Sequence, residues 1–215
     1  MAASHAADAG SNPAESIMKE FILRARKAKT GFIDMDNLPK EGKIDSVCAA
    51  ITNTLWISGD VRKDAAIHVV MEGPDNGPKT VSFYGNEIRG LKHDEKSMAD
   101  YLKFALSRGA HLRLNEEAHV RTGIKIAKKS FERLVYEKSQ QNVQMIFLDR
   151  EGKDIRGFKF QKDFVVIFGS PEGLSPKTEK FLASFDVSKV SLGPRTLFAA
   201  QCPIIVHNET DRRGL

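Results

Sequence analysis

Hydrophobic residues recur along the chain with helical spacing in some segments and strand spacing in others. In residues 44–55 the apolar positions lie three or four residues apart, which predicts an amphipathic helix, and residues 98–105 repeat this pattern. Residues 65–71 and 80–84 predict two strands, and the turn-forming segment 73–78 between them predicts a hairpin. Further elements are predicted as strands at 21–23 and 123–127 and as a helix after the capping residue Ser130.

Near-continuous apolar runs mark the last third of the chain. Residues 143–148 and 164–168 are typical of strands that are covered on both faces in a parallel sheet. Each run is predicted to lead into a glycine-bearing loop, at 149–152 and at 169–174, and a third strand at 189–192 leads into Gly193 and Pro194. Two helices complete this region, one beginning at Ser175 and Pro176 and one with Pro203 near its start.

The alternation of strands and helices predicts an α/β fold with a mostly parallel sheet flanked by helices. In such a sheet the loops that follow parallel strands gather at the carboxyl edge, where ligands bind. Glycine in these loops would let the backbone approach a ligand closely, because no Cβ stands in the way. A glycine that simply makes a tight turn is the better explanation of any single loop, so only the set of three indicates a binding edge.

Composition narrows the class of protein. The chain has 215 residues, 41% hydrophobic and 28% charged, which excludes a disordered or collagen-like protein. No window approaches the roughly 18 apolar residues that span a bilayer, and two cysteines cannot form a disulfide scaffold, so a cytoplasmic protein without a membrane segment is expected. The net charge of +5 suits nucleic-acid binding without requiring it. Two basic runs, 19–29 and 121–138, each carry +4 and could contact phosphates, although such runs are most often solvated surfaces.

The first 17 residues differ from the rest. They contain Ala, Ser, Gly, Asn and Pro, without Lys or Arg and without an apolar centre, which argues against a signal peptide and a mitochondrial transit sequence. We expect a disordered or artificial extension at 1–17, with Met18 as an alternative start. Residues 18–215 are then predicted to form one domain.

Common catalytic signatures are absent from the sequence. It has no G-x-G-x-x-G, no G-x-x-x-x-G-K-[ST], no H-E-x-x-H, no C-x-x-C and no G-x-S-x-G. A Rossmann-type oxidoreductase, a nucleoside triphosphatase and a zinc enzyme therefore lose their usual support. The six histidines show no metal-ligand spacing, so no metal is expected, and His68 within an apolar strand is predicted to be a structural histidine.

Several segments resemble one family in the same order along the chain. The segment 190–197, with the sequence VSLGPRTL, is followed by Gln201 and Cys202 and then by VHNE at 206–209. Together with FGSPEGL at 168–174 and FLD at 147–149, these residues resemble the closing half of the tRNA pseudouridine N1-methyltransferase family, a branch of the knotted SPOUT methyltransferases. The segments 20–25, 45–48 and 90–97 resemble the opening strand, first helix and central loop of that family.

The resemblance implies a fold, a cofactor and an assembly. The expected fold adds a deep trefoil knot at about 143–215, and the expected assembly is a homodimer. The knot would bind S-adenosylmethionine. Matching positions imply that the cofactor pocket is lined by Leu148, Gly169, Leu192, Gly193, Pro194, Arg195, Thr196, Leu197 and Cys202.

The implied reaction transfers the methyl group of S-adenosylmethionine to N1 of a pseudouridine in tRNA, most plausibly at position 54. N1 carries a proton that must leave, and Asp60 is our candidate base, with Arg62 as a partner for phosphate or for charge on the base. A turn aspartate beside a surface arginine is an equally good interpretation of this pair. Arg24 and Arg89 are candidate RNA contacts. Two alternatives stay open: a knotted methyltransferase acting on pseudouridine of rRNA, and a non-catalytic RNA-binding assembly factor of the same fold.

Overall fold

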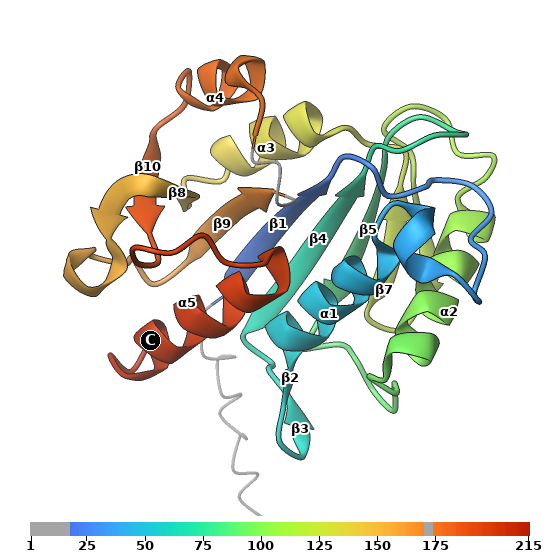
Figure 1. The fold of residues 1–215 in the computed structure, drawn as a ribbon, viewed down its shortest axis with the longest axis horizontal. Helices are drawn as coiled ribbons and strands as arrows, with labels where there is room; N and C mark the ends of the chain where they lie inside the picture. Colours follow the sequence, from blue (N-terminus) through green and yellow to red (C-terminus); the bar gives the residue numbers. More distant parts are fainter. Residues whose placement is uncertain (1–17, 170–173) are drawn as a thin grey trace, which may run out of the picture.

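The computed structural model describes residues 18–169 and 174–215, which contribute eight strands to one sheet (Figure 1). The strands are β1 (Lys19–Ala25), β4 (Ala65–Met71), β5 (Lys79–Tyr84), β6 (Glu117–Arg121), β7 (Ile124–Ala127), β8 (Gln144–Asp154), β9 (Phe164–Gly169) and β10 (Val187–Ser191). Their spatial order is β10-β8-β9-β1-β4-β5-β7-β6. The five strands from β10 to β4 run parallel and the other three are antiparallel, which confirms a mostly parallel α/β sheet.

Helices cover both faces of this sheet (Figure 1). On one face α1 (Ile44–Leu55), α2 (Glu95–Arg108) and α5 (Cys202–Asp211) pack over a core that includes Phe21 and Leu23 of β1. On the other face α3 (Phe131–Ser139) and α4 (Pro176–Leu182) belong to a smaller cluster around Ile22. Neighbouring β1 residues thus enter different cores, as the period of two in a strand requires.

The helical and hairpin predictions are confirmed. Residues 44–55 form α1, and β4 and β5 pair as an antiparallel hairpin. Both predicted serine caps are present, since Ser130 accepts a hydrogen bond from the N–H of Arg133 and Ser175 accepts one from the N–H of Thr178. The local sequence therefore determines where α3 and α4 begin.

The predicted loop at 149–152 is wrong, because β8 stays extended as far as Asp154. In the pairing with β10, Lys189 lies opposite Phe147 and the next residue, Val190, lies opposite Lys153. Residues 148–152 are therefore a wide insertion in β8 with no counterpart on β10. A Cβ on Gly152 would lie 2.4 Å from the backbone nitrogen of Val190, so glycine permits this close approach.

His68 is a buried structural histidine, as predicted. Its side chain lies between the hydroxyl of Ser82, 2.8 Å from Nδ1, and a carboxylate oxygen of Glu20, 2.7 Å from Nε2. Both ring nitrogens thus have partners within the sheet, and this histidine needs no ligand.

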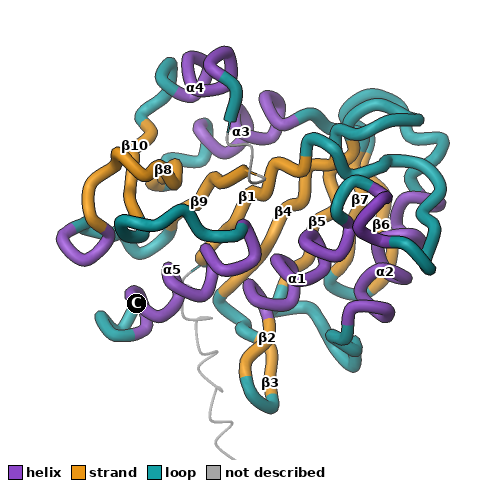
Figure 2. The backbone as a smooth tube through the Cα atoms, viewed as in Figure 1, coloured by secondary structure: helices purple, strands orange, loops and turns teal. Residues whose placement is uncertain are grey.

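The path of the chain after β10 positions the last helix (Figure 2). The loop at 192–198 runs across the front of β9, and α5 then returns toward the β8 and β10 edge. No helix within 18–169 and 174–215 is long and apolar enough to cross a membrane. The predicted extension at 1–17 and the middle of the second glycine-bearing loop, 170–173, lie outside the described residues.

Candidate functional site

A cavity lies where β8, β9 and β10 deliver their loops. From β8 it is lined by residues of the insertion, from β9 by the last two residues, and from β10 by the strand end and the loop beyond. Its lining consists of Phe147, Leu148, Asp149, Arg150, Phe168, Gly169, Leu174, Val190, Ser191, Leu192, Gly193, Arg195, Thr196, Leu197, Ala199 and Cys202. The structure thus brings together all the predicted cofactor residues except Pro194, which lines an adjoining cavity.

The predicted cofactor residues did not include several lining residues, among them Asp149, Arg150 and Ser191, although the segments quoted for the site contain them. Asp149 and Arg150 directly follow an apolar strand, which is a usable signal. The predicted loop at 149–152 did place these residues at the binding edge, but the expected feature of that loop was its glycine and not its charged side chains.

The loop after β10 supplies five residues of the cavity lining, Leu192, Gly193, Arg195, Thr196 and Leu197. Gly193 has φ of +137°, a conformation that other residues rarely adopt, and its N–H and carbonyl oxygen lie within 3.3 Å of the Ser191 hydroxyl. The N–H groups of Arg195, Thr196 and Leu197 donate to no carbonyl within the described part of the chain. These donors can therefore serve a ligand, and Gly193 gives the loop the turn that presents them.

Two ionisable side chains in the cavity have shifted pKa values. Partial burial raises the pKa of Asp149, but the hydrogen bond of 2.7 Å from Lys189, one from the N–H of Glu151 and the charges of Lys189 and Arg150 together hold that pKa below its ordinary value. Burial raises the pKa of the Cys202 thiol to about 11, and this thiol lies 3.6 Å from the carbonyl oxygen of Phe198. Asp149 is thus anionic at neutral pH. Cys202 is an uncharged thiol that lines the cavity and does not act as a nucleophile.

Arg24 does not lie free on the surface. Its guanidinium contacts Glu72 at 2.8 Å, Glu132 at 3.2 Å and the hydroxyl of Thr178 at 2.5 Å, and it lies over the ring of Phe131. Only 11% of the side chain is exposed. These partners are distant in the sequence, so no local pattern could have indicated the network.

Asp60 and Arg62 lie outside the cavity. Asp60 belongs to the hairpin of β2 (Trp56–Ile57) and β3 (Asp60–Val61), which projects from the lower edge of the sheet in Figure 1, and Arg62 directly follows β3. Asp60 is exposed and lies 3.7 Å from Lys63, whereas Arg62 forms two hydrogen bonds with Asp211 of α5. One chain by itself therefore does not join this hairpin to the cavity at the ends of β8, β9 and β10.

Arg89, the second candidate RNA contact, lies away from the cavity. Arg89 donates hydrogen bonds to the carbonyl oxygens of Asn86 and Ile88 and lines neither the cavity nor its neighbour. Within the residues described, no group of three or more His, Cys, Asp or Glu side chains could hold a metal ion.

Comparison with known proteins identifies the family. A family model for SAM-dependent RNA methyltransferases (SAM is S-adenosylmethionine) matches residues 18–215. The chain belongs to this family. The resemblance inferred from the sequence is thereby confirmed, and the protein is a SAM-dependent RNA methyltransferase.

Two curated relatives and one solved structure illustrate the match. Proteins of Methanococcus maripaludis (strain C5) and Methanococcus aeolicus, both named tRNA (pseudouridine(54)-N(1))-methyltransferase, are each 34% identical to this chain. The first alignment covers 91% of this chain and 99% of its relative, and the second covers 92% and 100%. The crystal structure of Archaeoglobus fulgidus Nep1 bound to S-adenosylhomocysteine superimposes with a TM-score of 0.57 at 12% identity, covering 92% of this chain and 99% of that one. This last similarity supports the fold.

Proposed function

We propose that the protein methylates N1 of pseudouridine 54 in tRNA, using S-adenosylmethionine bound in the cavity at the ends of β8, β9 and β10. The convergence of Leu148, Gly169 and the 192–197 loop on one cavity carries this proposal, because these segments come from three separate strands. The names of the family relatives support the choice of tRNA and of position 54. We also propose a cytoplasmic location, which suits the two free cysteines.

The residues of the cavity fit this cofactor chemically. Leu148, Leu192 and Leu197 offer apolar surface to an aromatic ring, and the N–H groups of the loop that donate to no carbonyl among the described residues offer donors. Arg195 and Asp149 offer opposite charges for a zwitterionic amino-acid group. The cofactor supplies a methyl group that its positive sulfur already activates. The residues of the chain then have to position the base and exclude water, which can account for much of the rate enhancement.

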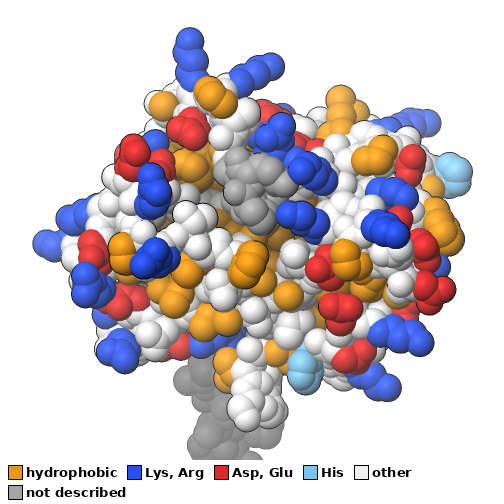
Figure 3. All heavy atoms as spheres, viewed as in Figure 1, with side chains coloured by type: hydrophobic (Ala, Val, Ile, Leu, Met, Phe, Trp, Pro, Cys, Tyr) orange, Lys and Arg blue, Asp and Glu red, His pale blue; other side chains and the backbone are white. Residues whose placement is uncertain are grey.

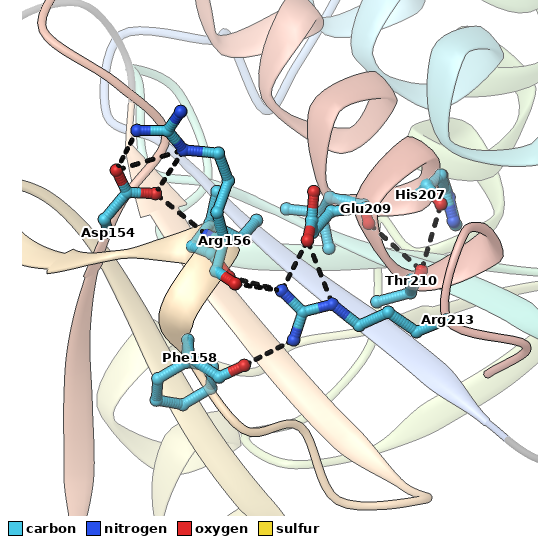
Figure 4. A network of polar contacts seen from close by, with 9 residues as sticks. Asp154, Arg156, Phe158, His207, Glu209, Thr210 and Arg213 are labelled. Carbon is cyan, nitrogen blue, oxygen red and sulfur yellow. Dashed lines mark hydrogen bonds and ion pairs between the residues drawn. The ribbon is translucent and has the colours of Figure 1, made fainter.

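We propose a trefoil knot at about 143–215. The observation that supports it is the contact between the end of α5 and the connection from β8 to β9. Arg213 donates hydrogen bonds to the carbonyl oxygens of Ile155, Arg156 and Phe158 (Figure 4). The carboxyl-terminal segment is thus bound to the connection between β8 and β9, and in a knotted chain these two parts would lie together.

We further propose a homodimer whose active site uses residues of both copies. Phe198 and Ile204, beside and on α5, are 71% and 46% exposed, which leaves apolar surface for a second copy. Asp60 lies outside the cavity of its own chain, so it could act as a base only if another copy presented it. The transfer forms the bond from N1 to the methyl carbon and breaks the bond from that carbon to sulfur. The N1 proton passes to Asp60, and Arg62 holds the hairpin through Asp211.

Methyl transfer from labelled cofactor to two tRNAs tests the proposed function. One tRNA carries pseudouridine at position 54 and the other carries uridine, and modified nucleosides are identified by mass spectrometry. We expect N1-methylpseudouridine from the first tRNA and no product from the second. Product in an rRNA pool alone would replace tRNA with rRNA as the substrate, and an absence of cofactor binding in calorimetry would favour a non-catalytic factor.

The role of Asp60 has its own test. Asp60→Asn should abolish turnover while the dissociation constant for S-adenosylmethionine stays the same. Asp100→Asn is the matched control, because it removes one exposed carboxylate of α2. Normal turnover in Asp60→Asn would remove this residue from the mechanism.

A further inference from the structure

A second cavity adjoins the cofactor cavity and no step above uses it. Its volume is about 780 Å³, and it lies between the insertion of β8, the end of β10 and the outer part of α5. The two cavities share Arg150, Ser191, Leu192 and Gly193. A ligand in the second cavity would therefore lie next to the cofactor cavity.

Charged residues of this region are mostly paired with each other (Figure 4). Asp154 and Arg156, which both line the cavity, form an ion pair of 2.6 Å. Glu209 lines the cavity as well, and its carboxylate accepts hydrogen bonds from Arg213. The two carboxylates of the lining are thus neutralised by Arg156 and Arg213.

Two arginines of the lining remain without such partners. Among the described residues, the guanidinium groups of Arg150 and Arg212 form no ion pair and no hydrogen bond. They approach the cavity from β8 and from the end of α5, which are far apart in the sequence. Basic side chains, with acidic ones between them, also lie along the edge of the molecule that carries β8, β10 and α5 (left in Figure 3). The cavity therefore carries an excess of positive charge.

Apolar walls accompany these two cations. Leu192, Pro194 and Ile205 line the same cavity. A ligand with anionic groups and flat apolar parts matches this combination, and a nucleotide has both. Arginine is well suited to phosphate, because its planar guanidinium forms two parallel hydrogen bonds.

We propose that Arg150 and Arg212 bind phosphate groups of the RNA substrate, next to the nucleotide that is methylated. This inference rests on the proposed function, since it assumes that the substrate is RNA whose target base reaches the cofactor cavity. In this proposal the second cavity holds the backbone of the RNA, whereas the cofactor cavity holds the methyl donor. Arg212 is the better residue to replace in a test, because it lines only the second cavity, whereas Arg150 lines both.

Filter-binding titrations of tRNA at several salt concentrations test the proposal. Arg212→Ala should weaken tRNA binding about 3- to 10-fold and lower the slope of log affinity against log salt by about 1, as expected for one lost phosphate contact. Arg212→Lys should restore most of that slope. Lys96→Ala, which removes one exposed cation of α2, is the matched control and should change neither quantity appreciably. The dissociation constant of S-adenosylmethionine, measured by calorimetry, should be the same in Arg212→Ala and the unaltered protein.

Two outcomes would overturn the proposal. An unchanged salt slope in Arg212→Ala would show that this arginine contacts no phosphate. Conversion of a dimer to a monomer by Arg212→Ala, seen by light scattering, would show that the cavity accepts acidic groups of a second copy instead. Methyl transfer by the unaltered protein tests the proposed function independently, so a failure of the reaction and a failure of this site are distinguishable.

Discussion

Arg24 donates a hydrogen bond of 2.5 Å to the hydroxyl of Thr178, and this contact fastens the end of β1 to the first turn of α4. In the pairing of β1 with β9, Arg24 also lies directly opposite Gly169. The segment from Gly169 to Thr178 is thus held to β1 at both ends, and two of its residues, Gly169 and Leu174, line the cofactor cavity. Arg24 therefore connects the stability of the sheet to the shape of the cavity.

Replacement of Arg24 should harm both folding and cofactor binding. Arg24→Ala leaves the carboxylates of Glu72 and Glu132 without their partner and removes the contact with Thr178. We expect the free energy of unfolding to fall by about 2 kcal/mol, because the arginine is mostly buried while its partners are only partly so. Urea denaturation and cofactor calorimetry measure the two effects.

Arg26→Ala is the matched control for Arg24→Ala, since Arg26 is exposed and two residues away. It should leave the unfolding free energy and the cofactor affinity unchanged. If Arg24→Ala kept both quantities but lost tRNA affinity, Arg24 would be the RNA contact that the sequence suggested.

The sequence predicts those features that depend on local patterns. The apolar spacing of residues 44–55 identifies α1, and the serine caps locate α3 and α4. The position of the cavity could also be predicted from the sequence, because the ends of parallel strands meet at one edge of the sheet.

Features that depend on contacts between distant residues were not predictable in this way. The insertion at 148–152 is defined by its register against β10, and its charged residues look like a turn. The pairs Arg24 with Glu72 and Arg62 with Asp211 join residues 48 and 149 positions apart. Periodicity likewise carries no information on threading, so the proposed knot was implied only by the family resemblance.

Glu20 should make the protein sensitive to acid. Burial raises the pKa of this carboxyl, but hydrogen bonds and charge from His68 and Lys138 outweigh it and lower the pKa to about 2. Because the pKa in the folded state lies below the ordinary value of 4.5, the carboxylate stabilises the fold above about pH 4.5, and this contribution is lost as the pH falls toward 2. The loss should be about 3 kcal/mol.

Unfolding free energies measured between pH 7 and pH 2 test this prediction. Glu20→Gln should be less stable at neutral pH and should lose less stability over the acidic interval than the unaltered protein. Glu87→Gln, at an exposed position, should follow the unaltered protein. Parallel curves for Glu20→Gln and the unaltered protein would contradict the assignment.

His207 should stay neutral across the physiological pH range. Its Nε2 lies 2.9 Å from the carbonyl oxygen of Thr54, which can only accept, so Nε2 carries the hydrogen, and the buried Nδ1 has no partner among the described atoms. Burial, together with the charges of Arg62 and Lys19, lowers the pKa of His207 to about 4. The unfolded chain binds this proton at a higher pH, so stability should decrease as the pH falls from about 6.5 to about 4.

NMR detection of the imidazole nitrogens measures the state of His207 directly. We expect the tautomer with hydrogen on Nε2 at neutral pH and a titration midpoint near pH 4. His207→Gln removes the resonance for assignment and should reduce the loss of stability between pH 6.5 and 4. A midpoint near 6.5 in the folded protein would contradict the buried, neutral state.

Gly152 and Gly157 should respond differently to replacement by alanine, because the space around the two residues differs. A Cβ on Gly152 would lie 2.4 Å from the backbone nitrogen of Val190 and 2.6 Å from the carbonyl carbon of Lys189, and backbone atoms cannot move aside as a side chain can. Gly152→Ala should therefore push β8 away from β10, lower the unfolding free energy by about 1–3 kcal/mol and weaken cofactor binding, because residues 147–150 line the cavity. A Cβ on Gly157 would meet no atom within 4 Å, so Gly157→Ala should leave stability unchanged or raise it by less than about 1 kcal/mol. Urea denaturation and cofactor calorimetry of both variants measure the difference, and equal values for the two would mean that the insertion in β8 does not depend on the close approach at Gly152.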